Sequence, residues 1–375
     1  MSAIKVSAIE VNEGLGNNRM HAETCQAFTP IQLKNSAGLA VQVLPFGGTI
    51  ASIHWQGQPM TLSYPNHAQW QHDSSCMGST AGRYANRIAN ARYQNSQGEW
   101  VQLAANQGLH TLHGGPQGFQ YQTWQVQSQS EQQVVLFLES ADGDQGFPGR
   151  LQIWQTIALV ENEVQISYHA TTDRETVVNL TNHCYFNLGD GQTLLDHDLQ
   201  IFAEQVLPVD AEGIPTSMPV PVESFGVADG DAKPHQTKPQ QALLDFRRPR
   251  KLDQSLQRSS AVGGLLHGLD HCFVQLTTAE LANWRAAVAA DSENLRLQLR
   301  LLATLRCGQR QLEVLSSQPG LQAYIGSYLS APFQPYQGIC LEAQNWPDAP
   351  NRPEFPSATL EVNQRYQQQI VYRFF

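Results

Sequence analysis

The chain has 375 residues, with 23 Lys plus Arg against 33 Asp plus Glu and a formal net charge of -10 at pH 7. This acidic balance disfavours a nucleic-acid partner, because neutralising phosphates requires clustered cations. No apolar run approaches the ~20 residues that cross a membrane, and residues 1–10 lack the apolar core and cleavage site of a secretory signal. The six cysteines are scattered, which indicates reduced thiols in a cytoplasmic protein rather than a disulfide framework or a zinc knuckle.

Most of the chain has the pattern of β-strands. An apolar run at residues 134–139 ends at a turn cluster, residues 142–149. Leu151–Val160 and residues 164–170 flank Glu-Asn-Glu, which predicts a β-hairpin. Leucines alternate with polar residues from 295 to 301, which predicts a strand with one apolar face. The 28 glycines and 20 prolines are spread along the chain and favour many short strands.

One helix is expected among these strands. Thr277 and Glu280 have the spacing of a capping box, and alanines dominate the following residues, so we predict a helix over residues 278–290. Residues 226–241 are predicted to form a long exposed loop, after which strand-like sequence resumes. The sequence therefore predicts an all-β fold, a large antiparallel β-sandwich with few short helices, as a single domain over residues 1–375.

The first polar cluster is Gly-Arg-Tyr-Ala-Asn-Arg at residues 82–87. Its two arginines, Arg83 and Arg87, are four residues apart, with Asn86 between them. An arginine beside an asparagine offers a fixed fork of donors and an amide, which can clamp neighbouring hydroxyl groups of a sugar. The alternative is that both arginines pair with nearby carboxylates.

The second cluster is Leu-His-Thr-Leu-His-Gly-Gly-Pro-Gln-Gly-Phe at residues 109–119. The glycines after His113 permit positive φ angles, so this histidine can project from a tight turn into a cleft. A zinc site is the alternative, in which His110 and His113 would join His183 or His271. No HExxH or comparable spacing supports that alternative.

Three further segments carry a possible acid, a possible base and one more carboxylate. His183 lies in an aromatic, β-rich segment at residues 179–188 that would hold its ring firmly, although a buried histidine often serves only the core. Glu342 follows a strand-like run and precedes a Pro-Asp-Ala-Pro-Asn turn, so a rigid backbone would fix its carboxylate for general-base work. The alternative for Glu342 is an ordinary acid at the lip of a strand. Asp270 supplies the remaining carboxylate.

Together and in this order, these clusters resemble the aldose 1-epimerase (galactose mutarotase) family. The matching segments span about residues 30–370: GRYANRIAN, LHGGPQGF, DGDQGFPG, NLTNHCYFNL, LPVDAEGIPT, GLDHCF, QPGLQAYIG and LEAQNWPDAPNRPEFP. The resemblance implies a galactose mutarotase-like β-supersandwich with an open sugar-binding cleft. It also implies an isomerase that interconverts the α and β anomers of free aldohexoses such as galactose and glucose.

The resemblance further implies roles for the matched residues. Glu342 would be the general base on the anomeric hydroxyl, and His183 would be the general acid at the ring oxygen. Five residues would hold the rest of the sugar: Asn86, Arg87, His113, Asp270 and Gln322. Ring opening needs one proton removed and one delivered, which suits an ionised base and a protonated imidazole. No cofactor or metal is required, the partner is a small aldose, and the protein is expected to be a monomer or a homodimer.

Three positions depart from the family pattern. Cys184 replaces a small hydroxyl residue, Ala323 replaces an aromatic residue, and Ser327 replaces an asparagine. None of them is a proton-transfer group, so activity is expected to persist. The change at Ala323 is expected to widen or reshape the sugar cleft. Residues 277–298 resemble an insertion to which no role is assigned.

Two other functions remain open. A hexose-6-phosphate 1-epimerase on the same fold would need extra cations for the phosphate, and Phe-Arg-Arg-Pro-Arg-Lys at residues 246–251 is the candidate, with a solvated turn as the alternative there. A non-catalytic sugar-binding module would keep the cleft and lose the chemistry. The presence of both Glu342 and His183 argues against that module.

Overall fold

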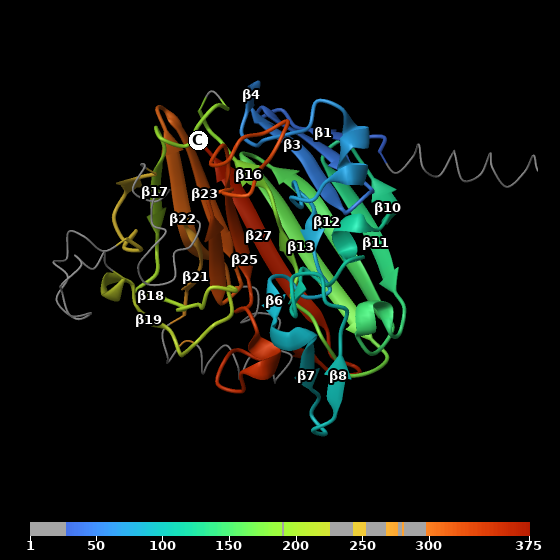
Figure 1. Ribbon diagram of the computed structural model, residues 1–375. Helices are drawn as coiled ribbons and strands as arrows, with labels where there is room; N and C mark the ends of the chain where they lie inside the picture. The colour runs from blue at the N-terminus through green and yellow to red at the C-terminus, as the bar shows by residue number, and fades with distance from the viewer. Residues whose placement is uncertain (1–27, 190, 226–242, 253–267, 277–279, 281–297) are drawn as a thin grey trace, which may run out of the picture.

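The computed structural model describes residues 28–189, 191–225, 243–252, 268–276, 280 and 298–375. The predicted helix over residues 278–290 lies outside the described residues, apart from Glu280, which is helical. The predicted loop over residues 226–241 also lies outside them. The described chain is built of β-strands joined by turns and short 3₁₀ helices, which confirms the predicted all-β class (Figure 1).

The largest sheet contains the predicted hairpin. Within the described residues it has nine strands, in the order β10 (Gln125–Gln129), β11 (Gln133–Ser140), β12 (Leu151–Val160), β13 (Glu163–Thr172), β27 (Tyr366–Phe374), β23 (Arg310–Ser316), β22 (Arg300–Cys307), β17 (Asp198–Ile201) and β20 (Arg250–Lys251). The strands β12 and β13 pair antiparallel from Leu151–Thr172 to Val160–Glu163, as the hairpin prediction requires. Every second residue of β12 is buried, because side chains alternate between the faces of a strand.

The strand predicted from alternating leucines at residues 295–301 is wrong in its position. The strand β22 begins only at Arg300, and Leu299, just before it, is exposed. A β-bulge between Leu301 and Ala303 then shifts the register against β23. Because a bulge adds one residue to one strand, it changes which side chains face the core. Residues 295–297 lie outside the described residues.

A second sheet packs against the first. In the described part of the chain it has six strands, in the order β16 (Tyr185–Phe186), β25 (Ile339–Gln344), β24 (Gly320–Tyr324), β21 (Asp270–Val274), β18 (Gln205–Val206) and β19 (Val220–Pro221). Leu341 and Ala343 of β25 share one hydrophobic cluster with Ile370 and Tyr372 of β27. One face of the second sheet therefore covers the core, and its other face is left for a site.

Smaller elements complete the described fold. A four-stranded sheet is formed by β1 (Ile31–Lys34), β2 (Leu39–Leu44), β3 (Thr49–Trp55) and β4 (Gln58–Pro59). Two-stranded pairs join β14 (Thr176–Val177) to β26 (Thr359–Leu360), β15 (Thr181–Asn182) to β5 (Thr80–Ala81), β6 (Arg87–Ile88) to β9 (Thr111–Leu112), and β7 (Arg92–Gln94) to β8 (Trp100–Gln102). The 3₁₀ helices are η1 (His67–His72), η2 (Ala89–Ala91), η3 (Phe119–Tyr121), η4 (Asp144–Gly146), η5 (Val222–Ser224) and η7 (Ala349–Asn351).

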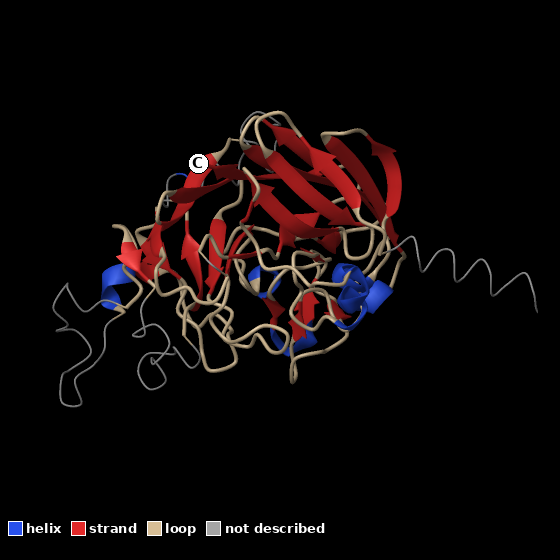
Figure 2. Cartoon of the chain, turned by 90° about the horizontal axis from the view of Figure 1, so that it is seen from above, coloured by secondary structure: helices blue, strands red, loops and turns tan. Residues whose placement is uncertain are grey.

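Strands and loops occupy different sides of the molecule. Seen from above, the long strands lie together, while many of the loops and several short helices lie on the opposite side (Figure 2). Loops placed on a rigid sheet scaffold are where binding residues commonly occur. No helix in the described residues is long and apolar enough to span a membrane.

Candidate active site

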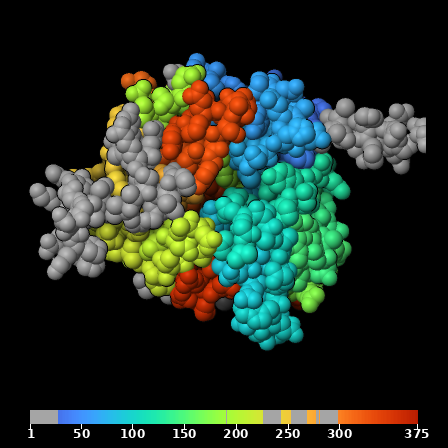
Figure 3. Space-filling view, viewed as in Figure 1, coloured from blue at the N-terminus to red at the C-terminus, as the bar shows by residue number. Residues whose placement is uncertain are grey.

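A cavity of about 410 Å³ lies on the face of the six-stranded sheet that points away from the core. That volume is within the ~300–1,000 Å³ typical of small-molecule sites. On this side of the molecule, segments coloured cyan, yellow-green and orange meet around a hollow (Figure 3). All seven predicted site residues line the cavity: Asn86, Arg87, His113, His183, Asp270, Gln322 and Glu342. The structure therefore brings together side chains that are up to 256 residues apart in sequence, between Asn86 and Glu342.

The strands β21, β24 and β25 position three of these side chains. Gln322 and Glu342 are directly opposite each other in the β24–β25 ladder. The Gln322 side-chain amide donates a hydrogen bond of 2.6 Å to Asp270 Oδ1. Glu342 lies inside β25 and not at its end, since the strand continues to Gln344. Because Glu342 lies in the ladder between β24 and β25, the sheet fixes the position of its backbone.

His183 precedes the short strand β16 and faces Glu342. Its backbone N–H donates to the Ser79 carbonyl at 3.0 Å, and its own carbonyl accepts from Gly78 N–H at 3.0 Å. The ring places Nε2 at 3.6 Å from Glu342 Oε1 and Nδ1 at 3.4 Å from Cys340 Sγ. Backbone and ring contacts together fix the imidazole beside the carboxyl group.

His113 and Asn86 support each other at the edge of the cavity. The His113 N–H donates to the Asn86 carbonyl, and the Asn86 N–H donates to His113 Nδ1 at 3.2 Å. Because Nδ1 accepts, a neutral His113 carries its proton on Nε2 and can donate from there. The next residue must be glycine: Gly114 has φ +84°, and a Cβ atom there would lie 2.0 Å from the Gly82 carbonyl oxygen.

The two arginines of residues 82–87 have separate environments. Arg87 lines the cavity, donates from Nε to Gln107 Oε1 at 2.7 Å, and has its backbone carbonyl bound by Asp348 N–H. Arg83 does not line the cavity and is only 1% exposed. It donates to the carbonyl groups of Pro148 and Gly149, so Arg83 stabilises the fold and only Arg87 faces the cavity.

Burial controls the electrostatics of the site. It lowers the pKa of His183 to about 4, with Asp270 and a hydrogen bond to its own carbonyl as smaller opposing effects. Burial also raises the pKa of Glu342 well above its usual value; the negative charge of Asp270 adds to this, and Arg87 partly offsets it. Burial, together with the charges of His183 and Arg87, lowers the pKa of His113. Burial therefore shifts the proton that this pair shares toward the carboxyl group and away from the imidazole.

The cavity contains acceptor atoms without partners. Glu342 Oε2, Gln322 Oε1 and Gln120 Oε1 are buried and make no hydrogen bond within the described residues. A buried acceptor without a partner costs about 1–3 kcal/mol. Hydroxyl groups of a bound ligand would satisfy these atoms, so the cavity is built for a ligand with several hydroxyl donors.

Several cavity residues were missed by the sequence analysis. Tyr185 and Tyr324 each lie two residues after a predicted site residue and share its cavity. Their positions follow from the two-residue period of extended chain, so that signal was present in the sequence. Further lining residues come from turns or from the short helix η3 and carried no such signal: Gln107, Gln120, Tyr121 and Tyr328.

The zinc alternative gains no support from the described residues. His110 lies outside the cavity lining, and its Nε2 is 3.3 Å from Glu212 Oε2. His271 is buried on the other face of β21 from Asp270 and also does not line the cavity. Among the described residues there is no group of three His, Cys, Asp or Glu side chains placed to hold a metal ion.

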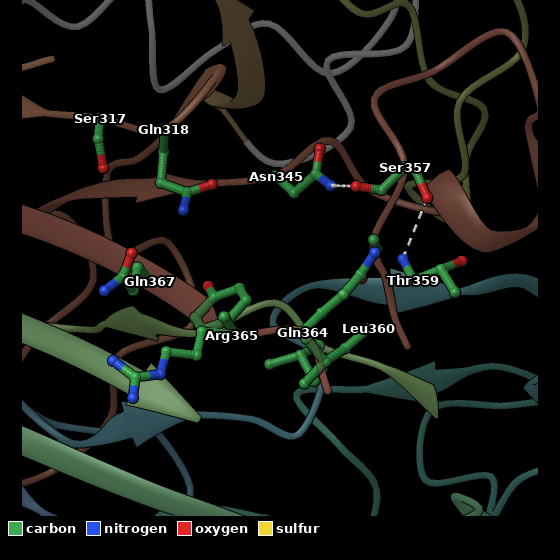
Figure 4. Close-up of a pocket in the computed structure, with 12 residues that line it drawn as sticks. Ser317, Gln318, Asn345, Ser357, Thr359, Leu360, Gln364, Arg365 and Gln367 are labelled. Carbon is green, nitrogen blue, oxygen red and sulfur yellow. Dashed lines mark hydrogen bonds between the residues drawn. The ribbon is translucent and has the colours of Figure 1, made fainter. Parts of the chain in front are cut away.

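A second hollow lies on another part of the chain and is much smaller. Ser317, Gln318, Asn345 and residues around Thr359 line it, and an amide hydrogen of Asn345 is donated to the Ser357 carbonyl (Figure 4). Its volume of about 50 Å³ is far below the ~300 Å³ at the lower end of small-molecule sites. It is therefore too small for a ligand of several hydroxyl groups.

Comparison with known proteins decides the family. The model of the aldose 1-epimerase family matches residues 30–373. The chain is 33% identical over 365 residues to the aldose 1-epimerase of Escherichia coli (strain K12), covering 93% of this chain and 96% of that protein. The chain belongs to the aldose 1-epimerase family. The galactose mutarotase of Mus musculus is 32% identical over 351 residues, which cover 90% of this chain and 91% of the mouse protein.

Solved structures agree with this family. An aldose epimerase homologue from C. elegans superposes with a TM-score of 0.76 at 26% identity, covering 92% of this chain and 98% of that one. A galactose 1-epimerase from Lactobacillus acidophilus gives a TM-score of 0.75 at 25% identity, covering 92% of this chain and 94% of that one. The predicted family, the predicted mutarotase-like fold and the prediction of an isomerase are confirmed.

The expectation that Ala323 widens or reshapes the sugar cleft is wrong. Ala323 does not line the cavity: it is fully buried and lies opposite Leu341 and His271 in the ladders of β24. Since Gln322 and Tyr324 face the cavity, the residue between them must face the core. The small side chain therefore changes the core and not the cleft.

The cations proposed for a phosphate also lie elsewhere. Arg247 is bound by Asp245, Glu204 and Glu223, and Lys251 is bound by Asp198. No residue of the segment 246–251 lines the cavity. Arg87 is the one Lys or Arg among the described lining residues, and acidic Asp270 and Glu342 share the cavity with it. This balance of charge does not favour a sugar phosphate.

Proposed function

We propose that this protein interconverts the α and β anomers of free aldohexoses such as galactose and glucose. The reaction is acid–base catalysed opening and reclosure of the sugar ring. The observation that carries the proposal is the pairing of Glu342 Oε1 with His183 Nε2 at 3.6 Å on the wall of a cavity that fits a monosaccharide. The names of the aldose 1-epimerase and galactose mutarotase relatives support the same substrate class.

Ring opening transfers two protons in the proposed mechanism. The Glu342 carboxylate takes the proton of the anomeric hydroxyl, and the O1 electrons form the aldehyde while the bond from C1 to the ring oxygen breaks. The His183 imidazolium delivers its Nε2 proton to that ring oxygen. The open aldehyde turns about C1–C2, and the two residues exchange roles when the ring closes on the other face. Each proton transfer contributes about 10²–10⁴ in rate.

The single proton held by Glu342 and His183 suits this sequence of steps. The reaction needs one acid and one base, and the pair carries one proton before and after ring opening. Burial favours that proton on the carboxyl group over the imidazole. Sugar hydroxyls that donate to Glu342 stabilise its carboxylate and lower its pKa, which moves the proton to His183 before the chemistry begins.

The remaining residues hold the sugar in this proposal. His113 donates from Nε2, because its Nδ1 is already used by Asn86 N–H. Asp270 and the unpartnered Oε1 atom of Gln322 accept hydroxyl protons, and Arg87 donates to sugar oxygens. Hydrogen bonds of this kind supply binding and orientation, while the pair performs the proton transfers.

We also propose that the protein works in the cytoplasm, as a single domain and as a monomer or homodimer. The five cysteines within the described residues are free thiols, which suits a reducing compartment. Size-exclusion chromatography with light scattering on the full chain distinguishes the monomer from the dimer.

Polarimetry on freshly dissolved α-D-galactose tests the proposal. We expect the purified protein to speed the decay of optical rotation far beyond the buffer blank, with glucose as a second substrate. A decay equal to the blank would favour the non-catalytic sugar-binding module, which isothermal titration with galactose would then detect. Turnover of glucose 6-phosphate above that of glucose would instead favour the phosphate-specific alternative.

A further inference from the structure

Both ring nitrogens of His183 have a neighbour from the same strand. Nε2 faces Glu342 Oε1, and Nδ1 lies 3.4 Å from Cys340 Sγ. Cys340 precedes Glu342 by two residues in β25 (Ile339–Gln344), so both side chains leave the same face of the strand. One strand therefore contacts the imidazole at the nitrogen proposed to transfer a proton and at the opposite nitrogen.

We propose that Cys340 is a positioning residue whose sulfur accepts a hydrogen bond from His183 Nδ1–H. This bond keeps His183 in the tautomer whose Nε2 is free to exchange a proton with the sugar ring oxygen. The proposal rests on the proposed role of His183 as the general acid. It assigns Cys340 an effect on rate through His183, without any contact between Cys340 and the sugar.

Proton counting decides which nitrogen must be held. When the imidazolium gives its Nε2 proton to the ring oxygen, the product is a neutral ring with its remaining proton on Nδ1. On reclosure the same Nε2 takes the proton back. The Nδ1 proton is therefore retained through the whole cycle, and the atom beside Nδ1 must act as an acceptor. In many histidine sites a carboxylate or a carbonyl takes that place, and it fixes the tautomer.

The state of the thiol fits an acceptor. Burial raises the pKa of Cys340 well above its usual value, and the nearby charge of Glu342 raises it further. The sulfur thus remains a neutral thiol with lone pairs, and a thiolate that would compete for the proton does not form. Sulfur is a weak acceptor, and the ring also has a hydrogen bond to its own carbonyl. We therefore expect Cys340 to change the rate by a modest factor.

Two substitutions at Cys340 and one matched control test the proposal in the full chain. Cys340→Ala removes the acceptor, and Cys340→Ser replaces the sulfur with an oxygen that can still accept. Cys184→Ala is the control, because Cys184 is equally buried, directs its sulfur to the Ile50 carbonyl, and belongs to the core cluster. The measurements are kcat and KM for galactose, and the ¹⁵N spectrum of the histidine rings at pH 7 without sugar.

In the wild type we expect His183 to show a protonated Nδ1 and an unprotonated Nε2. In Cys340→Ala the signals should shift toward a mixture of tautomers, and kcat should fall about two- to tenfold, the effect of losing one neutral hydrogen bond, with KM unchanged. Cys340→Ser should restore most of the rate, and Cys184→Ala should leave both readouts at wild-type values. The absence of one ring signal in His183→Asn assigns the His183 resonances.

Two results would overturn the proposal: a wild-type ring protonated on Nε2, or an unchanged kcat in Cys340→Ala. Failure of the proposed function gives a different pattern. In that case the wild type itself shows no turnover of galactose, or His183→Asn retains full turnover, while the wild-type ring spectrum still reports which nitrogen carries the proton. The two failures can therefore be told apart.

Discussion

Arg83 and Arg87 belong to the same short motif but have opposite surroundings. Both terminal nitrogens of Arg83 are used inside the fold, by the carbonyls of Pro148 and Gly149 and by the Ser140 hydroxyl. Arg87 has its Nε bound to Gln107 and lines the cavity. The chain between them passes through Asn86, whose φ of 65° turns the backbone, so the two side chains leave in different directions.

The surroundings of Arg83 and Arg87 differ in how many buried polar groups have hydrogen-bond partners within the protein. Around Arg83 the protein itself supplies acceptors for both terminal nitrogens, and Nε alone has no partner within the described residues. Around Arg87 the neighbouring Gln322, Glu342 and Gln120 keep buried acceptor atoms without partners. Buried polar groups are normally hydrogen-bonded, so a cluster of exceptions in one cavity indicates that a ligand completes the bonding.

The largest effect is expected for Glu342→Gln. The amide is nearly isosteric with the carboxyl group but cannot accept and return a proton, so kcat should fall by about 10⁴-fold. The thermal unfolding midpoint should stay within a few degrees of wild type, because Glu342 is 2% exposed and its Oε2 has no partner to lose within the described residues. Polarimetry and differential scanning calorimetry check both statements. A variant with wild-type kcat excludes Glu342 as the base.

A smaller loss is expected for His183→Asn. The variant should reduce kcat by about 10²–10³-fold, because water in the cavity can still deliver some protons to the ring oxygen. His197→Asn is the matched control: His197 is fully buried and its Nε2 accepts from Leu188 N–H, outside the cavity lining. The control should lower thermal stability and leave kcat of the folded fraction intact. Equal kcat losses in both variants would mean that His183 acts only through stability.

The two arginines should divide their effects between binding and stability. Arg87→Ala should raise KM for galactose by about 10–100-fold, the effect of hydrogen bonds from a charged group, with a small change in unfolding. Arg83→Ala should lower the free energy of unfolding by about 3 kcal/mol, because it leaves buried carbonyls without donors. In the folded fraction of Arg83→Ala, KM should be unchanged.

Urea unfolding and Michaelis–Menten kinetics on both variants make this comparison quantitative. If Arg83→Ala raised KM as much as Arg87→Ala, the division between scaffold and site would be wrong.

The sequence predicted those parts of the fold that depend on local alternation. The hairpin of β12 and β13 appears where two apolar runs flank a polar turn. The leucine strand at 295–301 was wrong at Gln298 and Leu299, which precede β22, and residues 295–297 lie outside the described residues. The bulge between Leu301 and Ala303 also changes the alternation inside β22, and no residue type announces it. Likewise, Arg83 and Arg87 could not be separated in advance, since the turn at Asn86 removes any regular period between them.

The seven predicted site residues meet in one cavity because whole motifs, in order, indicated a family. Their individual roles stay predictions until the variants above are measured. The two-residue period of strands could have predicted three more placements from the sequence. It places Tyr324 and Cys340 beside the site and Ala323 in the core. Gln120 could not have been found this way, because the short helix η3 brings it to the cavity only through tertiary packing.

The pH dependence of the reaction tests the electrostatics of the cavity. The proposed chemistry needs Glu342 and His183 to hold one proton together, so activity falls wherever the pair holds two or none. Burial lowers the pKa of His183 to about 4, so the second proton binds only as the pH falls toward 4. Burial raises the pKa of Glu342, so the last proton leaves only at a pH well above the usual carboxyl range. These are apparent values of the pair and not of either residue alone.

We therefore expect kcat/KM to be nearly constant through neutral pH, to fall about tenfold per unit below pH 4, and to fall again on the alkaline side. Exposed groups would give a different profile, with the acid limb near the ordinary glutamate pKa of about 4.3 and the alkaline limb near the ordinary histidine pKa of about 6.5. Stopped-flow polarimetry or a coupled dehydrogenase assay from pH 3.5 to 10 would distinguish the two profiles. An alkaline limb near 6.5 would show that water enters the cavity and that Glu342 and His183 titrate as separate, solvated groups.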